Sequence, residues 1–334
     1  MQSQKTIDLL TIGNTIVDME YNISDERLHS LGVEKGAMML IDAARKNELI
    51  EELGPKVHLC NGGSVANSLF VAHHMGLTGH HHGVVGNDDL GTFVMDDYQN
   101  QGISASFSDT MVSGDTGCCL VLITPDGERS MLTYLGVSSQ FSASTDLTPL
   151  VQASRSVFLE GYLVADDACF DTILLPILST AAAHATSIIL TLSDAGLASF
   201  FSKRFNNLLN GHIDILFCNH QEALALSGEK TIPNAQTFFE PTVNETVITD
   251  GPHGAYIFHK STSYHVPTSA IQPTDTTGAG DAFAGAYITK RLKGHPIESS
   301  ATSAHDAARH VISNYGARPS ALVDYLKSNA IAHF

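Results

Sequence analysis

The stretch DTTGAGDAFAGAYITKRLKG, residues 275–294, places two glycines and an alanine between two aspartates, directly ahead of a run with the pattern of a helix. Gly278, Ala279 and Gly280 leave the backbone bare, and the first turn of the expected helix directs free N–H groups toward that loop. Such a terminus binds phosphate oxygens or a developing negative charge. Asp281 on the same turn could deprotonate an attacking hydroxyl, so the motif indicates phosphoryl transfer. A glycine-rich helix start with a merely capping aspartate is the alternative.

Two other nucleotide-binding motifs fit the chain less well. It contains no GxxxxGK[ST] sequence, and SGEKT at residues 227–231 only partly resembles one. A dinucleotide-binding fold would place GxGxxG after the first strand, whereas TIGNTIVD at residues 11–18 offers a single glycine there. A nicotinamide-dependent oxidoreductase is therefore disfavoured.

A second group of small polar residues and glycines lies near the N-terminus. Asn14 and Asp18 follow the first expected strand, IDLLTIG. Gly62 and Gly63 open an expected helix in NGGSVANS, with Asn67 on its first turns. Carboxylate and amide groups beside a bare backbone suit a polyhydroxylated ligand at the end of an α/β sheet. The alternative is that these residues form ordinary turns and a tight helix start.

A third motif, IDILFCNHQEALAL, places Asn219 and Glu222 three residues apart where a strand meets a helix. Such a pair on one helical face could hold Mg²⁺ through water molecules. An ordinary N-cap with a first-turn acid explains the pair almost as well.

A fourth motif, TVITDGPHGAYIF at residues 246–258, predicts a strand, a glycine-rich turn and another strand. Thr249, Asp250, Gly251 and Gly254 could contact a nucleotide from this turn, or could simply form a hairpin.

The elements that must position these motifs alternate along the chain. Short apolar runs (IDLLTIG, SVFLEG, SIILTLSD, IDILFCN and TVITDG) are separated by helical patterns such as the one over residues 64–75. This alternation predicts an α/β fold with a mainly parallel sheet covered by helices on both faces.

Two segments, at about 19–41 and 105–136, contain short strands and turns without a crossover helix. We expect them to form hairpins of a small antiparallel β-lid inserted into a single domain over residues 1–334.

Composition excludes several classes of protein. The formal net charge of −17 disfavours a nucleic-acid surface or a polybasic membrane anchor. The five cysteines include no CxxC pair, which fits reduced thiols better than a disulfide framework. The N-terminus lacks the apolar core of a signal peptide, and the most apolar window contains a proline, a histidine and several hydroxyls. We therefore expect a cytoplasmic protein.

In this order the motifs resemble the ribokinase (PfkB) family of carbohydrate and nucleoside kinases. The resemblance extends from GNTIVD at Gly13 to YGARPS at Tyr315, and its most specific parts are DTTGAGDAFAGA and NGGSVANSLFVAHHMGLTGHHHGVVGNDDLG. It implies a three-layer α/β/α body with a β-lid over the sugar site. It also implies ATP-dependent, Mg²⁺-assisted phosphorylation of a hydroxymethyl group.

The resemblance assigns a role to each motif. It makes Asp281 the catalytic base and residues 278–280 the anion hole, with Arg129 of the lid closing over the site. The implied sugar contacts are Asn14, Asp18, Gly62, Gly63, Asn67 and Glu160. Asn219 and Glu222 match an element near Mg²⁺ and phosphate, and residues 249–254 match an ATP loop. A monovalent-cation site, for K⁺, matches Asp275 and Thr277 with backbone groups of Val311, Asn314, Gly316 and Ser320.

The acceptor is less well defined than the reaction. GGSxxN and the segment GERSMLTYLGVSS resemble the adenosine-kinase branch and its bacterial relatives. No aromatic clamp for a purine is evident, so ribose or another furanose is the second candidate. A nucleotide or sugar sensor without catalysis is disfavoured, because a sensor does not need Asp281. We expect a small-molecule substrate and a monomer or homodimer.

Overall fold

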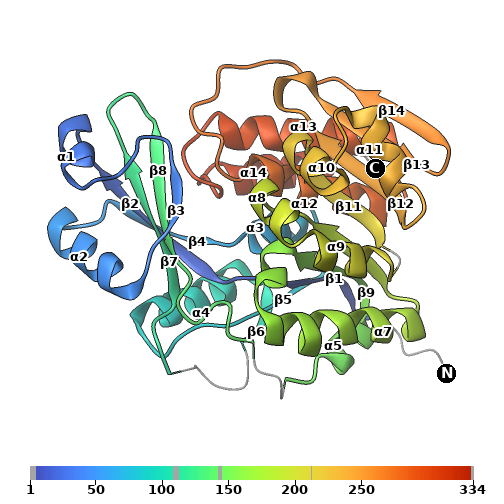
Figure 1. Cartoon of the computed structure of the whole chain (residues 1–334), viewed down its shortest axis with the longest axis horizontal. Helices are drawn as coiled ribbons and strands as arrows, with labels where there is room; N and C mark the ends of the chain where they lie inside the picture. Colours follow the sequence, from blue (N-terminus) through green and yellow to red (C-terminus); the bar gives the residue numbers. More distant parts are fainter. Residues whose placement is uncertain (1–4, 108–112, 142–144, 212, 332–334) are drawn as a thin grey trace.

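The computed structural model describes residues 5–107, 113–141, 145–211 and 213–331. These residues form two β-sheets, a nine-stranded sheet in the body of the molecule and a five-stranded sheet at one end (Figure 1). From β6 to β12 neighbouring strands are parallel, and β13 and β14 extend the sheet as an antiparallel hairpin. In spatial order the strands are β14 (Thr262–Val266), β13 (Ala255–His259), β12 (Val243–Thr249), β11 (Ile213–Asn219), β10 (Ser187–Thr191), β9 (Ser154–Glu160), β1 (Ile7–Ile12), β5 (Gly79–Gly83) and β6 (Ser104–Phe107).

Helices cover both faces of the large sheet. Successive strand residues point to opposite faces, so Leu9 and Phe158 belong to one core while Leu10 and Leu159 belong to the other. This explains why the body strands are apolar throughout. The first core includes α3 (Ser64–His74), α4 (Asp89–Gln101), α12 (Ala279–Leu292), α13 (Ile297–Ile312) and α14 (Leu322–Ile331). The second includes α5 (Thr148–Ala153), α7 (Leu175–His184), α8 (Ala195–Phe200), α9 (Ser202–Leu209), α10 (His220–Ser227) and α11 (Ile232–Phe239).

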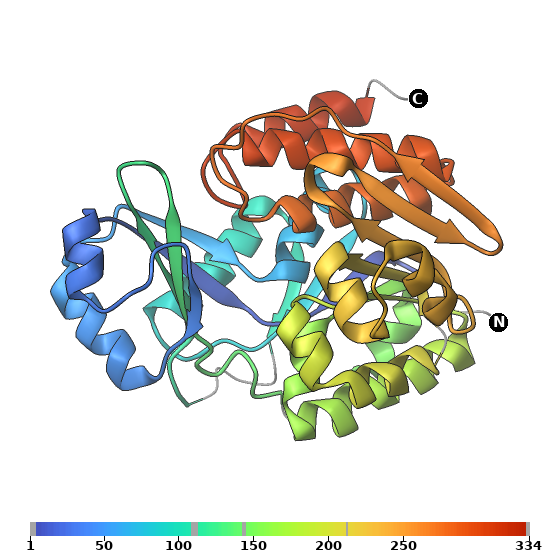
Figure 2. The ribbon, with the colours of Figure 1, turned by 45° about the horizontal axis from the view of Figure 1, so that its top comes forward.

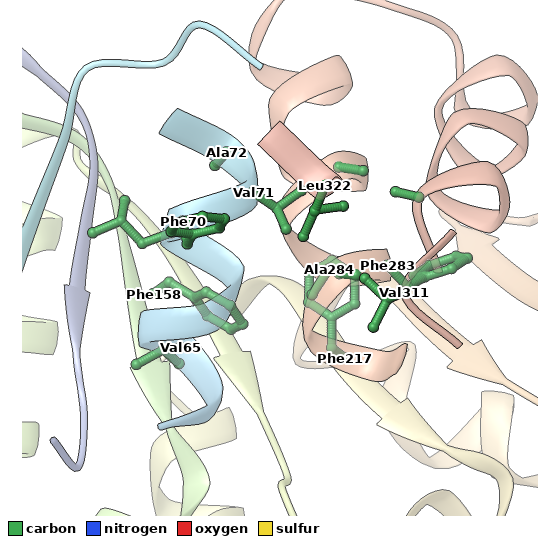
Figure 3. Close-up of a cluster of buried hydrophobic side chains, with 14 of the residues drawn as sticks. Val65, Phe70, Val71, Ala72, Phe158, Phe217, Phe283, Ala284, Val311 and Leu322 are labelled. Atoms are coloured by element: carbon green, nitrogen blue, oxygen red, sulfur yellow. The ribbon is translucent and has the colours of Figure 1, made fainter. Parts of the chain in front are cut away.

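The packing of α12 against α3 positions the site. Both helices contribute to one buried cluster, with Val65 and Phe70 from α3 and Ala284 from α12 (Figure 3). The backbones approach so closely that a Cβ added at Gly285 would lie 2.3 Å from the carbonyl oxygen of Ser68. A glycine at residue 285 is therefore required to bring the first turns of the two helices together.

The small sheet has helices on one side only. Helices α1 (Asp25–Ser30) and α2 (Ala43–Leu53) lie on its outer face, away from the body (Figures 1 and 2). Strands β2 and β7 are parallel, as are β3 and β8, whereas β2–β4 and β7–β8 are antiparallel. In spatial order the strands are β3 (Met38–Leu40), β8 (Arg129–Tyr134), β7 (Gly117–Ile123), β2 (Ile16–Asn22) and β4 (His58–Gly62).

The fold class predicted from the sequence is confirmed, but the small sheet differs from the expected antiparallel lid. The sheet is mixed, it includes β4, and the segment at 19–41 contains helix α1. The segment at 105–136 begins inside β6, which pairs in parallel with β5 in the large sheet. Helix α4 supplies the crossover that this parallel pair needs. The pairing of β2 with β7 joins segments about a hundred residues apart, so no local pattern reveals it.

The 3₁₀ turn Gly161–Ala165, the short helix α6 (Asp167–Cys169) and the π turn Phe170–Leu174 connect β9 to α7. Among the described residues, no helix is long and apolar enough to span a membrane.

Candidate active site

The glycine loop forms the start of helix α12. Gly278 is its N-cap with a φ of +74°, and a Cβ there would lie 2.5 Å from the Cβ of Ala317. Gly280 is exposed, and a Cβ on it would meet nothing within 4 Å. The two glycines therefore serve different purposes: Gly278 permits the left-handed turn, whereas Gly280 leaves the space in front of the helix open.

Asp281 lies on the first turn of α12 and is held by two residues of α3. The Ser64 hydroxyl donates to Oδ1 at 2.7 Å, and the Asn67 side-chain amide donates to Oδ2 at 2.9 Å. Burial raises the pKa of Asp281, whereas these hydrogen bonds and the charge of Arg318 lower it. The carboxylate is thus oriented by donors that stabilise its ionised form, as a general base requires.

A cavity of about 130 Å³ connects Asp281 to the third and fourth motifs. Its polar lining includes Asn219 and Thr249, which are the last residues of the parallel strands β11 and β12. The carboxyl ends of parallel strands are where α/β sheets bind ligands. The complete lining is Ser64, Ser68, Phe158, Thr191, Ser193, Phe217, Cys218, Asn219, Glu222, Thr249, Gly280, Asp281, Phe283 and Ala284.

Asn219 and Glu222 form a capping box at the start of α10. The Asn219 side-chain oxygen accepts from the Glu222 backbone at 2.8 Å, and the Glu222 carboxylate accepts from the Asn219 backbone at 3.0 Å. Burial raises the pKa of Glu222 to about 7. The N-cap interpretation is therefore confirmed. No group of three or more metal-ligating side chains was found among the described residues.

The fourth motif forms a hairpin turn, as one of the two interpretations predicted. A Cβ on Gly254 would lie 2.3 Å from the carbonyl oxygen of Val266, so this glycine is required for the close approach of two strands. Gly251, by contrast, is exposed with open space around it. The Asp250 carboxylate interacts with His220 Nδ1 at 3.0 Å. The turn therefore leaves Gly251 open, two residues after Thr249, which lines the cavity.

The N-terminal motif brings its residues together between the two sheets. A Cβ on Gly62 would lie 2.9 Å from Asp18 Oδ1, and one on Gly63 would lie 2.3 Å from the Asn14 carbonyl oxygen. Burial raises the pKa of Asp18 to about 7, although the charge of Arg318 opposes this. The side-chain oxygen of Asn14 is buried without a hydrogen-bond partner. Buried polar atoms are normally satisfied, so an oxygen of this kind suits a ligand hydroxyl.

Glu160 lies behind this motif. Its side chain is buried, and its carboxylate accepts from the backbone N–H groups of Asn14 and Val65, each at 3.4 Å. Burial raises the pKa of Glu160 to about 8. Glu160 thus supports the backbone of the N-terminal motif, and its direct contact with a sugar stays a prediction.

The inner face of the small sheet carries residues that the sequence motifs did not identify. Register places Asp18 opposite Cys119, Cys119 opposite Thr133, and Thr133 opposite Leu40, so all four share the face turned away from α1 and α2. The next row on the same face consists of Glu20, Val121, Met131 and Met38. Leu40 is 71% exposed and Met38 is 54% exposed. An exposed apolar strip, formed by Met38 and Leu40 of β3, therefore lies on the same face as Asp18, with two strands between them.

Arg129 connects the small sheet to the loop ahead of α12. Its guanidinium lies 3.1 Å from Glu20 Oε1 and 3.2 Å from Asp275 Oδ2. The Asp275 carboxylate also accepts from the backbone N–H groups of Thr277 at 2.9 Å and Gly316 at 2.7 Å. Arg129 thus neutralises the carboxylate that the resemblance assigns to a monovalent cation.

Two other residues lie in or near the site without a signal in the sequence motifs. Ser193 lines the cavity with a φ of +70°, an uncommon conformation for a residue other than glycine. The buried side chain of Arg318 donates to Asn67 at 2.9 Å. Arg318 is the third residue after Tyr315 in YGARPS and lies 37 residues beyond Asp281. At that separation the sequence gives no indication that the two side chains are close.

Comparison with known proteins identifies the family of the chain. The chain belongs to the pfkB family of carbohydrate kinases, whose sequence profile matches residues 34–323. It is therefore a phosphotransferase with a hydroxyl group as acceptor.

Two solved structures and a curated relative show the range of this similarity. The adenosine kinase from Sinorhizobium meliloti is 30% identical with a TM-score of 0.87, over 97% of this chain and 99% of that one. A probable sugar kinase from Rhizobium etli CFN 42 is 30% identical with a TM-score of 0.88, over 98% and 100%. The ribokinase of Staphylococcus aureus is 26% identical over 63% of this chain and 67% of its own length. The relatives thus include both nucleoside and sugar kinases.

Proposed function

We propose that this kinase transfers the γ-phosphate of ATP to the 5′-hydroxyl of a nucleoside, with adenosine as the first candidate. The observation that carries this proposal is the inner face of the small sheet, where Asp18 and the exposed apolar side chains of Leu40 and Met38 share one surface. A nucleoside would match this surface, since its hydroxylated ring could face Asp18 while its aromatic base faces the apolar side chains.

The chemistry of the strip favours a base over a simple sugar. Asp18 can accept from vicinal hydroxyls, and Leu40 and Met38, across two strands on the same face, offer exposed apolar surface to an aromatic ring. A free pentose would leave Leu40 in water, whereas a nucleobase would cover it. The strip consists of a leucine and a methionine, which is consistent with a sequence that shows no aromatic clamp for a purine. The similarity to an adenosine kinase supports the same choice.

In the proposed reaction Asp281 takes the proton of the attacking hydroxyl. Ser64 and Asn67 orient the carboxylate, and the backbone N–H groups of Gly278 and Gly280 stabilise the transferring phosphoryl group, whereas that of Ala279 donates to Thr276. Closure of the small sheet over the acceptor would exclude water from this centre. We expect Arg129 to take part in that closure from its place at the junction between the small sheet and the α12 loop.

ATP and magnesium fit the other end of the cavity. Gly251 and Gly280 present exposed backbone without obstruction, and Asn219 is exposed beside them. Magnesium in kinases is held largely by phosphate oxygens and water, so one or two protein groups such as Asn219 and Glu222 suffice. When bound, the ion neutralises charge on the phosphates.

Potassium does not fit the arrangement at Asp275. Its carboxylate already has an arginine partner and two backbone donors, and the carbonyl oxygen of Val311 accepts from Asn314 at 2.9 Å. A second cation at the same oxygen would lie next to the guanidinium and be repelled. We therefore propose that turnover does not require K⁺.

The decisive experiment measures ADP release with adenosine, other nucleosides, ribose, fructose and 2-keto-3-deoxygluconate as acceptors. The proposal expects the largest kcat/KM for a nucleoside, and the same rate in potassium and tetramethylammonium salts. Preference for ribose or fructose would favour a sugar kinase. No turnover of any acceptor despite tight ATP binding would favour a sensor.

A specificity variant tests the apolar strip. Leu40→Ser should lower kcat/KM for the nucleoside roughly tenfold, equivalent to about 1.4 kcal/mol of lost apolar burial, and should leave turnover of a free sugar unchanged. Phe200→Ser is the matched control, because Phe200 is 82% exposed on α8, outside the site. Equal behaviour of the two variants toward the nucleoside would contradict a base-binding strip.

A further inference from the structure

Arg318 is a buried cation next to the proposed base without being in contact with it. It lies between α13 and α14, its side chain is only 5% exposed, and its guanidinium stacks 4.9 Å from the ring centre of Phe70. The carboxylate oxygen paired with it is Asp97 Oδ2, 3.5 Å from Nη1. Burial of an arginine side chain has a large desolvation free energy unless its N–H groups donate hydrogen bonds. The group that accepts from Nε therefore indicates what holds Arg318 in place.

That acceptor is the side-chain oxygen of Asn67, at 2.9 Å. The nitrogen of the same amide donates to Asp281 Oδ2 at 2.9 Å. An amide has one accepting end and one donating end, whereas a guanidinium only donates and an ionised carboxylate only accepts. The opposite orientation of Asn67 would direct two donors at each other on one side and two acceptors at each other on the other side. Arg318 and Asp281 therefore require the same orientation of the amide.

We propose that Arg318 is a positioning residue, which acts through Asn67 by keeping the side-chain amide turned so that its NH₂ group donates to Asp281. This inference rests on the proposed role of Asp281 as the base. Without Arg318 the amide is free to rotate away, and Asp281 Oδ2 loses a donor. The bond from Ser64 to Oδ1 remains.

The consequence is a change in the pH at which the enzyme becomes active. The ionised base is favoured by the Asn67 donor, so losing that donor raises the pH needed to ionise Asp281. The charge of Asp281 in turn raises the pKa of Asp18, Glu160 and Glu222. Tyr162 feels the same charge. Because several of these groups titrate in the same range, the test must compare matched variants.

The test records kcat/KM against pH, with ADP release and the best acceptor, for wild type and Arg318→Met. Methionine keeps a long side chain over Phe70 but removes the donor and the charge. We expect the acid limb of the profile to move up by about one pH unit. Arg318→Lys, which retains a charged donor, should recover part of the shift and also serves if the methionine variant does not fold. An unmoved acid limb in a folded Arg318→Met protein would overturn the proposal.

Asp97→Asn is the matched control. It removes the carboxylate on the other side of the guanidinium and leaves the Arg318–Asn67 contact in place, so its acid limb should not rise. Loss of a nearby negative charge by itself favours ionisation of Asp281, so the same upward shift in Asp97→Asn as in Arg318→Met would show a general structural disturbance and would also overturn the proposal.

A double-mutant cycle separates action through Asn67 from direct action of the charge. In an Asn67→Ala background, Arg318→Met should cause a clearly smaller shift, because the amide through which Arg318 acts is gone and only the direct effect of its charge remains. An equal shift in both backgrounds would mean that the guanidinium acts on Asp281 directly. Failure of the proposed function would look different, since Asp281→Asn would then retain wild-type turnover.

Discussion

The two halves of the site are built from different material. On the proposed acceptor side, between the large and small sheets, the available polar groups are mainly side chains, and burial raises the pKa of Asp18 to about 7 and of Glu160 to about 8. On the nucleotide side the accessible groups are largely backbone, at Gly251 and Gly280, which are both exposed. The proposed acceptor half thus offers partly buried carboxylates and amides, whereas the proposed nucleotide half offers exposed glycine turns.

This difference follows from what each half must recognise. A site distinguishes a neutral hydroxylated ligand from other molecules by hydrogen bonds. In a buried site a ligand that cannot form these bonds leaves polar groups unpaired, which costs binding free energy. A polyphosphate is bound by N–H groups and helix dipoles, which need no side chain. Substitutions in one half should therefore weaken binding of the acceptor, and substitutions in the other half should weaken binding of ATP. Substitution of Asp281, at the junction, should leave both binding steps intact and slow the phosphoryl transfer.

The largest effect is expected at the junction. Asp281→Asn keeps the size of the side chain and removes the base, so kcat should fall by about 10²–10⁴. Dissociation constants for ATP and acceptor, measured by calorimetry, should change little. Near-normal turnover of the folded variant would mean that Asp281 only caps helix α12 and is not the catalytic base.

A pair of glycine substitutions tests the nucleotide half. Gly280→Ala should fold normally, because the added methyl group meets no protein atom, yet kcat/KM for ATP should fall by about 10²-fold, the typical cost of a 1 Å displacement near reacting atoms. Gly278→Ala is the contrasting variant.

At Gly278 the expected loss is of stability. Alanine would adopt a left-handed conformation at a cost of about 1–2 kcal/mol and would also meet Ala317. Denaturant unfolding of the two variants measures this difference. Equal stability, or ATP kinetics unchanged in Gly280→Ala, would contradict the separate purposes assigned to the two glycines.

Asp18→Ala tests the acceptor half. Removing this carboxylate leaves acceptor hydroxyls without a partner, so acceptor binding should weaken by about 1–3 kcal/mol while ATP affinity stays constant. Calorimetric titration with each ligand separates the two outcomes. Equal losses for both ligands would mean that Asp18 supports the structure of the whole site instead of binding the acceptor.

The smallest effect concerns stability and pH. The pKa of Glu160 rises from 4.5 to about 8 on folding, so the folded state holds a proton that the unfolded state releases over this range. The free energy of unfolding of the free enzyme should therefore decrease as pH rises from 4.5 to 8.

Glu160→Gln should reduce that slope, as measured by denaturant unfolding at several pH values. Glu240→Gln, at an exposed position, controls for the loss of one negative charge. An unchanged slope in Glu160→Gln would show that burial does not govern this carboxyl.

The sequence determined the features that local chemistry encodes. Alternating strands and helices gave the α/β class, because apolar runs of strand length between helical patterns fit a covered parallel sheet. The start of α12 at Ala279 followed from the glycines and the acid, and α3 followed from its helical pattern. The hairpin around Gly254 followed from its turn residues.

The tertiary structure decided which distant segments meet. The small sheet pairs β2 with β7 and includes β4, and only this pairing puts Leu40 and Met38 on the same face as Asp18. The contacts of Asp281 with Ser64 and Asn67 depend on α12 packing against α3, across more than two hundred residues of chain. Arg318 joins them from a third segment.

The physical reason is that periodicity and capping act within a few residues, whereas the site is assembled by packing between elements remote in sequence. The residues within each motif could be named from the sequence, since their types reveal the chemistry. Their partners could not, because an amide, an arginine or a leucine reveals nothing about the carboxylate or ligand it faces until two elements are placed together.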